Sequence, residues 1–173
     1  DSMQVYKELK ILTARPSKLD EEKTPHHLYG HIGISDKYSA GKWRNQAEEK
    51  ITQIKNRGNL PIICGGTGLY VKVLQDGISP IPDIPDNVAK KTDALVTKVG
   101  GIKAIELIRE SDPSFAIKLH PNDRQRIVRA LSVINATGKS LTEWQQMNYP
   151  KNSSDINYFV IHLIPQRELL YRT

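Results

Sequence analysis

A short apolar run followed by a glycine-rich turn constrains the fold of this chain more than any other feature. The run Leu60-Pro61-Ile62-Ile63-Cys64 is continuous and rich in β-branched residues, which is typical of a strand buried on both faces. Gly65-Gly66-Thr67-Gly68 follows it, and apolar residues at 69, 71, 73 and 74 predict a helix that continues to about residue 77. Helix, buried strand, glycine turn and helix in succession indicate an α/β fold with a parallel sheet.

The helix before that strand is predicted over residues 40–57. Its apolar side chains recur every three or four residues and therefore share one face: Trp43, Ala47, Ile51 and Ile54. Ser39 can cap its start, and Gly58 can end it in the left-handed conformation. A second buried strand is predicted over residues 158–164, and residues 1–34 are expected to form loops with short elements.

The middle of the chain is predicted to be an all-helical insertion. Prolines punctuate residues 79–85, and helical spacing of apolar residues runs from 86 to about 136. Asp112 before Pro113 indicates a capped helix start, Asn122 with Gln125 fits a capping box, and Gly138 ends the last helix. That last helix is expected to bury one stripe of residues: Ile127, Ala130, Leu131 and Ile134. With a polar loop over 145–157, we predict a core of residues 1–78 and 151–173 and an insertion over 79–150.

The charge balance favours a polyanionic partner. The chain has 25 basic and 19 acidic residues, a formal net charge of +6. A solvated surface on a somewhat basic protein explains the same number. The single Cys64 excludes an internal disulfide framework and favours a reducing compartment such as the cytoplasm. No run approaches the roughly 18 apolar residues of a membrane span.

Two segments have residues suited to chemistry on a nucleotide. The carboxylate of Asp1 can orient an amine and accept its proton, and the Gln4 amide can pair with a base edge. The turn 65–68 lets backbone amides approach an anion at a helix start, and Thr67 adds a hydroxyl. A solvated chain end and a tight strand-to-helix turn are the structural alternatives. Gly138-Lys139-Ser140 does not complete a phosphate-binding loop, because Val133 stands where the pattern needs glycine.

A third segment has residues suited to binding RNA. Gln125, Arg126 and Arg129 lie on the polar side of one predicted helix, where arginines can bind phosphates or stack on a base. A solvated helix face is the alternative. The histidines at 26, 27 and 31 lack the ligand set of a tetrahedral metal site, so no metal site is predicted.

These segments together resemble the tRNA dimethylallyltransferase family. The resemblance rests on the order of motifs along nearly the whole chain: Asp1-Ser2-Met3-Gln4-Val5-Tyr6, Thr13-Ala14-Arg15-Pro16, Pro25-His26-His27-Leu28, Cys64-Gly65-Gly66-Thr67-Gly68-Leu69-Tyr70, Asp112-Pro113, Asn122-Asp123 and Arg129-Ala130-Leu131. It implies a P-loop nucleotide-kinase-like fold. It also implies transfer of a dimethylallyl group from dimethylallyl diphosphate to the exocyclic amine of the adenine beside the anticodon, with Mg²⁺ and release of diphosphate. The implied partner is a tRNA anticodon stem-loop, and the complete protein is expected to be a cytoplasmic monomer.

The same resemblance assigns residues. Asp1 matches the catalytic aspartate, and the tRNA contacts match Asp1, Ser2, Met3, Gln4, Thr67, Gln125, Arg126, Ile127, Val128 and Arg129. No cofactor-binding residue is assigned, because the family's phosphate loop would lie before Asp1. We expect an internal piece of a longer protein that is inactive alone. The alternatives are a nucleotide kinase or ATPase of the same fold, and a non-enzymatic RNA-binding or degenerate split-gene product.

Some positions depart from the family pattern. Residues 8–16 stand where the family usually has Gly-Leu-Asp-Ile-Gly-Thr-Ala-Lys-Pro, so Leu12 replaces a turn glycine and is expected to alter or strain the backbone. Ala89 stands at a usually basic position, with Lys90 and Lys91 after it, and Ser132 replaces a usual glutamate.

Overall fold

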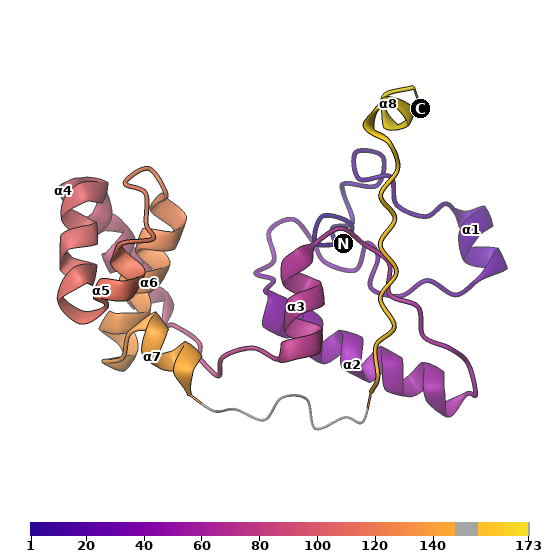
Figure 1. The fold of residues 1–173 in the computed structure, drawn as a ribbon, viewed down its shortest axis with the longest axis horizontal. Helices are drawn as coiled ribbons and strands as arrows, with labels where there is room; N and C mark the ends of the chain where they lie inside the picture. The colour runs from indigo at the N-terminus through magenta and orange to yellow at the C-terminus, as the bar shows by residue number, and fades with distance from the viewer. Residues whose placement is uncertain (148–155, 173) are drawn as a thin grey trace. The chain divides into compact units, whose positions relative to one another are not determined.

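The chain folds into two compact units, each with a core of its own. The computed structural model describes residues 1–147 and 156–172. One unit comprises Asp1–Gly77 with Lys151–Thr173, and the other comprises Ile78–Pro150 (Figure 1). The division after Gly77 falls just before the proline-punctuated linker.

The first unit is built around two helices that pack against each other. Its helices are α1 (Lys18–Lys23), α2 (Ala40–Asn56), α3 (Gly68–Asp76) and α8 (Arg167–Leu170). The helices predicted over 40–57 and from 69 to about 77 are therefore confirmed, and Ser39 caps α2 through its side chain. The buried residues of α2 meet Tyr70, Val73 and Leu74 of α3, and the rings of Trp43 and Tyr70 stack with centroids 4.2 Å apart.

The two predicted buried strands are not formed in the described residues, so the predicted parallel sheet is not confirmed. Residues 60–64 and 158–164 have no strand assignment, and most of their apolar side chains are open to solvent: Ile62 is 78% exposed and Phe159 is 90% exposed. Tyr158 is an exception, because it is partly buried against the core that α2 and α3 form. The one isolated β-bridge in the described part of the chain joins Tyr6 and Ile32 in parallel. A strand buried on both faces needs neighbouring strands and a covering layer on each side, and the described residues supply neither.

The second unit is all-helical, as predicted for residues 86–136. It contains α4 (Asp86–Ser111), α5 (Pro113–Ala116), α6 (Arg124–Thr137) and α7 (Leu141–Gln146) (Figure 1). The long helix α4 is interrupted at Gly100, whose φ is 80°. The core includes the predicted residues Ile127, Ala130 and Leu131, and Ile134 packs against it while partly buried.

The ends of these helices test the capping predictions. Asp112 caps α5 with Pro113 in the first turn, and Gly138 ends α6 in the left-handed conformation, so both predictions are confirmed. The cap of α6 is Asp123 rather than Asn122, because the Asp123 carboxylate accepts a hydrogen bond from the Arg126 amide at 3.3 Å. Of the polar loop predicted over 145–157, residues 148–155 lie outside the described residues, and α7 continues to Gln146.

Within the described ranges, no helix combines the length and apolar character that crossing a membrane requires.

Candidate functional site

The beginning of the chain lies against the glycine turn, although 65 residues separate them. The Ser2 amide donates to the Thr67 hydroxyl oxygen at 2.9 Å, and that hydroxyl in turn donates to Ser2 Oγ at 3.2 Å. Thr67 is the N-cap residue of α3, but its side chain does not cap the helix. The hydroxyl instead joins the turn to the Asp1-Ser2 segment, which places two of the predicted site segments together.

Backbone amides hold the carboxylate of Asp1 in place. Its Oδ1 accepts from the Met3 amide at 2.9 Å, and its Oδ2 accepts from the Gly66 amide at 3.3 Å. A Cβ at Gly65 would come within 2.9 Å of the Asp1 backbone nitrogen, so this close approach requires glycine. Because a carboxylate has about four lone-pair positions, each oxygen can still accept a proton or hydrogen bond from a ligand.

An open pocket of about 450 Å³ lies beside this carboxylate. Its lining consists of Asp1, Met3, Gln4, Leu12, Thr13, Gly65 and Gly66. This volume lies within the range of about 300–1,000 Å³ that is typical of ligand pockets. The predicted residues Asp1, Met3 and Gln4 therefore meet at one cavity. Thr67 lies outside its lining and is hydrogen-bonded to Ser2, between Asp1 and Met3.

The amide of Gln4 has one defined orientation. Its Nε2 donates to the carbonyl oxygens of Thr13 at 3.0 Å and of Ala14 at 3.3 Å. Two carbonyls can only accept, so the NH₂ end must face them, and Oε1 is the end left for a ligand. The sequence suggested an amide that can pair with a base edge; the structure leaves only its acceptor oxygen for such pairing.

Leu12 and Thr13 line the pocket, but sequence reasoning assigned neither of them to the site. The expected backbone strain at Leu12 is not found. Among the described residues other than glycine, positive φ occurs at Ala14 (47°) and Leu28 (64°) instead. The Leu12 side chain is 81% exposed, so the change from glycine adds an apolar surface to the pocket rim. Only its departure from the family pattern could have pointed to this position.

The remaining predicted tRNA contacts lie on α6, in the second unit. Gln125, Arg126 and Arg129 are exposed on this helix. Ile127 has no exposed surface, so its side chain cannot touch an RNA in this structure and belongs to the core instead. Val128 is partly buried against the same core. The helix thus presents polar residues outward and buries the apolar ones between them.

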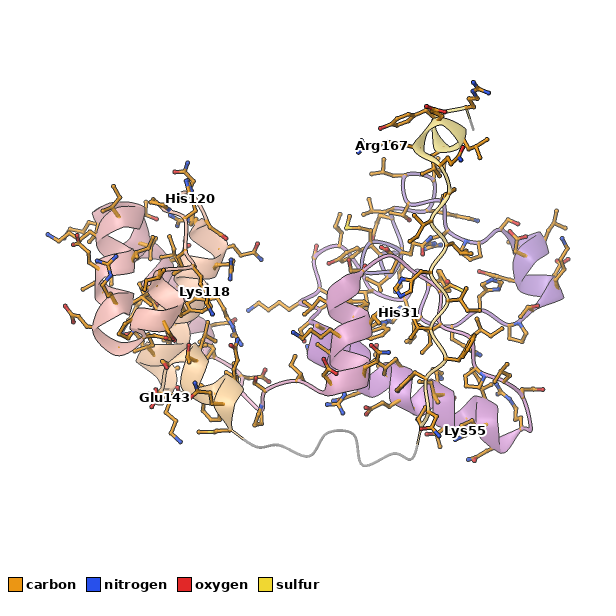
Figure 2. All side chains as sticks on the ribbon, in the orientation of Figure 1. His31, Lys55, Lys118, His120, Glu143 and Arg167 are labelled. Carbon is orange, nitrogen blue, oxygen red and sulfur yellow. The ribbon has the colours of Figure 1, made fainter. Side chains whose placement is uncertain are left out.

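The positive groups around α6 differ in their partners. Arg124 donates to the Asp93 carboxylate at 2.6 Å and to the Thr97 hydroxyl at 2.7 Å. Arg126 lies 3.7 Å from the Asp123 carboxylate and 5.5 Å from the centre of the Phe115 ring. Lys118 and His120 lie on the segment between α5 and α6 (Figure 2). This part of the second unit is therefore rich in cations.

The residues present do not form a magnesium cage. The described part of the chain contains no group of three or more His, Cys, Asp or Glu residues placed to hold a metal. Mg²⁺ binds through one or two carboxylates and substrate phosphates. The pocket is lined by a single carboxylate, that of Asp1. Of the histidines, His31 pairs with Gln46 at 3.2 Å and His26 with the Thr24 carbonyl at 2.7 Å. We derive no step through a metal.

Comparison with known proteins gives consistent matches. The family described as IPP transferase matches residues 4–173. A tRNA dimethylallyltransferase of Parvibaculum lavamentivorans is 45% identical over 170 residues, which are 98% of this chain and 54% of that protein. One from Rhodopseudomonas palustris is 42% identical over 99% of this chain and 54% of its own length. The chain thus spans about half the length of the curated relatives it matches.

The fold also resembles that of a solved structure. It is a eukaryotic dimethylallyltransferase acting on tRNA, which superimposes with a TM-score of 0.67 and 30% sequence identity. The match covers 83% of this chain and 36% of that protein.

Proposed function

Because this chain belongs to the IPP transferase family, we propose that the protein it represents modifies tRNA by prenyl transfer. The proposed reaction moves a dimethylallyl group from dimethylallyl diphosphate to the exocyclic amine of the adenine beside the anticodon. The amine nitrogen bonds to the allylic carbon as the carbon–oxygen bond to the diphosphate breaks. One proton leaves the amine, and diphosphate is released.

The single observation that carries this proposal is the placement of Asp1. Its carboxylate is held by the Met3 and Gly66 amides at the wall of the pocket. A carboxylate in this position can orient the amine and accept the proton that it loses, the role of a general base.

Gln4 supports an amine-bearing base as the ligand. With its NH₂ group donating to Thr13 and Ala14, the side chain offers the pocket only its oxygen. Asp1 and Gln4 are then both acceptors, and adenine presents two N–H bonds on its exocyclic amine. A base with a carbonyl at that position would set oxygen against oxygen, which costs affinity.

The second unit supports tRNA as the substrate. We propose that residues 79–150 form an insertion that grips the anticodon stem-loop, with Gln125, Arg126 and Arg129 of α6 toward the RNA. These side chains are exposed, as are Lys118 and His120 in the segment that precedes α6, and arginine can pair with phosphate or stack on a splayed base. A tRNA substrate and the single cysteine make the cytoplasm the expected compartment.

The exposed extended segments support a larger fold than the described residues form alone. We propose that residues 60–64 and 158–164 become strands of a P-loop nucleotide-kinase-like parallel sheet in the complete protein. Their apolar side chains are suited to burial, and most of them now face solvent. The likeness to a solved dimethylallyltransferase supports the same architecture.

A modification assay tests the function. The chain would be completed with the segments that the Parvibaculum lavamentivorans relative carries outside the matched region, then incubated with tRNA and dimethylallyl diphosphate. Mass spectrometry of the digested tRNA should show a prenylated adenosine. The 173-residue chain alone should give none, because its sequence contains no phosphate-binding loop. An unmodified tRNA with the completed protein, or phosphate transfer from ATP instead, would reject the proposal.

A further inference from the structure

We infer that Arg15 is a positioning residue for the pocket, and that Gly30 provides the space that its guanidinium occupies. The role of the pocket in this inference rests on the proposed function, whereas the contacts of Arg15 with Tyr6, Lys7 and Gly30 do not depend on it. Arg15 lies outside the pocket lining and touches no proposed ligand. Its importance comes from the backbone that it holds.

Arg15 fastens the segment that follows the Asp1–Gln4 stretch. Its Nη1 donates to the carbonyl oxygen of Tyr6 at 2.9 Å and reaches that of Lys7 at 3.4 Å. A charged donor strengthens such bonds, and the planar guanidinium fixes their direction. One side chain thereby ties the 9–15 loop to the backbone on which Gln4 sits.

Gly30 is the surface on which this guanidinium rests. A Cβ at Gly30 would lie 1.6 Å from Nη1, 2.2 Å from Cζ and 2.7 Å from Nη2 of Arg15. The φ of Gly30 is +52°, a region that disfavours side chains in any case. Any residue larger than glycine must therefore displace the Arg15 guanidinium from the position in which it donates to Tyr6 and Lys7.

The same three segments also meet at Gln4, which links the arrangement to the pocket. The Gly30 amide donates to the Gln4 carbonyl at 2.9 Å. The Gln4 side chain donates to Thr13 and Ala14, the residues just before Arg15. Val5, next in the chain, is 1% exposed and accepts from the His31 and Ile32 amides; His31 marks this place in Figure 2. Arg15 and Gly30 therefore set where the Gln4 acceptor points.

Hydrogen exchange on the chain itself tests the geometry. Arg15→Ala should speed exchange of the Gly30 and Lys7 amides roughly tenfold or more, since a hydrogen bond from a charged group is lost. Exchange in α6 should not change. Gly30→Ala should act similarly in the wild-type background. In the Arg15→Ala background it should add less, because the displaced guanidinium is absent and only the strain of the positive φ remains. Lys10→Ala is the matched control, since it removes one exposed charge from the same loop.

Kinetics of the completed protein test the positioning role. Arg15→Ala should lower kcat more than it raises KM for tRNA, and Arg15→Lys should restore part of the loss by donating to the same carbonyls. Fully additive effects of the Arg15 and Gly30 variants on exchange would overturn the inference, as would unchanged exchange in Arg15→Ala. If the completed wild-type protein does not modify tRNA, the proposed function fails, while the exchange results still decide whether Arg15 and Gly30 act as one unit.

Discussion

Asp1 and Gln4 illustrate how backbone contacts determine what a side chain can do. Two amides hold the Asp1 carboxylate, and two carbonyls turn the Gln4 amide so that its oxygen is free. Both side chains are left as acceptors at one pocket. The pair is therefore suited to a ligand that brings N–H bonds, and of the two side chains only a carboxylate such as that of Asp1 is basic enough to accept a proton.

Replacing the Asp1 carboxylate by an amide separates these two roles. In the completed protein, Asp1→Asn keeps the shape and one acceptor but removes the base. We expect the rate of prenyl transfer to fall by about 10²–10⁴-fold, the range typical of general-base catalysis. Binding of tRNA should stay within a few-fold. Single-turnover kinetics and a filter-binding assay measure the two quantities. An equal loss of both would assign Asp1 to positioning, and an unchanged rate would remove it from the chemistry.

The contact of Asp1-Ser2 with Thr67 joins two motifs that are sixty-five residues apart, and no local sequence pattern links them. Only the family resemblance, which assigns both motifs to the tRNA contact, pointed to it. The orientation of Gln4 and the contact of Arg15 with Gly30 could not be predicted from the sequence. Each depends on where a loop returns in space, and a side chain's partners across a fold leave no periodic signal in the sequence.

At the level of elements, helices were predictable where strands were not. The helices α2, α3 and α6 follow from local spacing and from nearby caps, which a chain satisfies within itself. A strand such as 60–64 depends on partners elsewhere, so an apolar run alone shows only that burial would be favourable. The cap of α6 was predicted at Asn122 but is Asp123. Both residue types are good caps, and the backbone conformation decides between them.

Asp112 joins two elements of the second unit and is buried. Its Oδ1 accepts from the Phe115 amide at 3.1 Å and the Thr142 hydroxyl at 2.8 Å, and its Oδ2 accepts from the Thr142 amide at 3.0 Å. Burial by itself would raise the pKa of Asp112, but hydrogen bonds from Thr142, Phe115 and Ser114 together lower the pKa below its ordinary value. The carboxylate thus caps α5 and holds the start of α7.

Removing this carboxylate should weaken the second unit. Asp112→Ala should reduce its free energy of unfolding by about 2–4 kcal/mol, from a lost cap and buried donors left unpaired. Asp112→Asn should reduce it less, since Oδ1 keeps its partners. A lowered native pKa gives stability that is present above the unfolded pKa of about 3.9 and is lost as pH falls through the native pKa. The advantage of wild type over Asp112→Asn should therefore shrink below about pH 4. Urea unfolding monitored by Trp144 fluorescence in a Trp43→Phe background measures this; an advantage independent of pH would contradict it.

The break in α4 offers a matched pair of glycines. A Cβ at Gly101 would lie 2.0 Å from the Pro121 carbonyl oxygen, whereas one at Gly100 would meet nothing within 4 Å. Gly100→Ala should cost about 1–3 kcal/mol, because φ 80° with ψ 163° is a backbone region that essentially only glycine adopts. Gly101→Ala should cost clearly more, since backbone atoms of the segment before α6 must move. Thermal unfolding by circular dichroism compares them. Equal losses of stability would show that the backbone at Pro121 can move away from the new Cβ at little cost.

At the scale of the whole molecule, more than one basic surface contributes to the net charge of +6 and could contact an RNA. The second unit carries exposed Arg126 and Arg129 on α6, and exposed Lys90 and Lys91 on α4. The ion pair between Arg126 and Asp123 is exposed and 3.7 Å long, and such surface pairs contribute little stability. Replacing Asp123 by an RNA phosphate as the partner of Arg126 would therefore cost little free energy.

The salt dependence of tRNA binding can identify which of these surfaces the RNA contacts. Each phosphate neutralised releases a condensed counterion, and the slope of log affinity against log salt changes by about 0.7 per contact on a single strand. Arg126→Ala with Arg129→Ala should therefore flatten the slope by roughly 1–1.5 and weaken binding. Lys90→Ala with Lys91→Ala removes the same charge from α4 and should change the slope less. If the arginines instead stack on bases, affinity should fall with a smaller change in slope, because stacking releases no counterion. If the lysine pair flattens the slope and the arginine pair does not, α4 rather than α6 faces the tRNA backbone, and the role proposed for α6 is wrong.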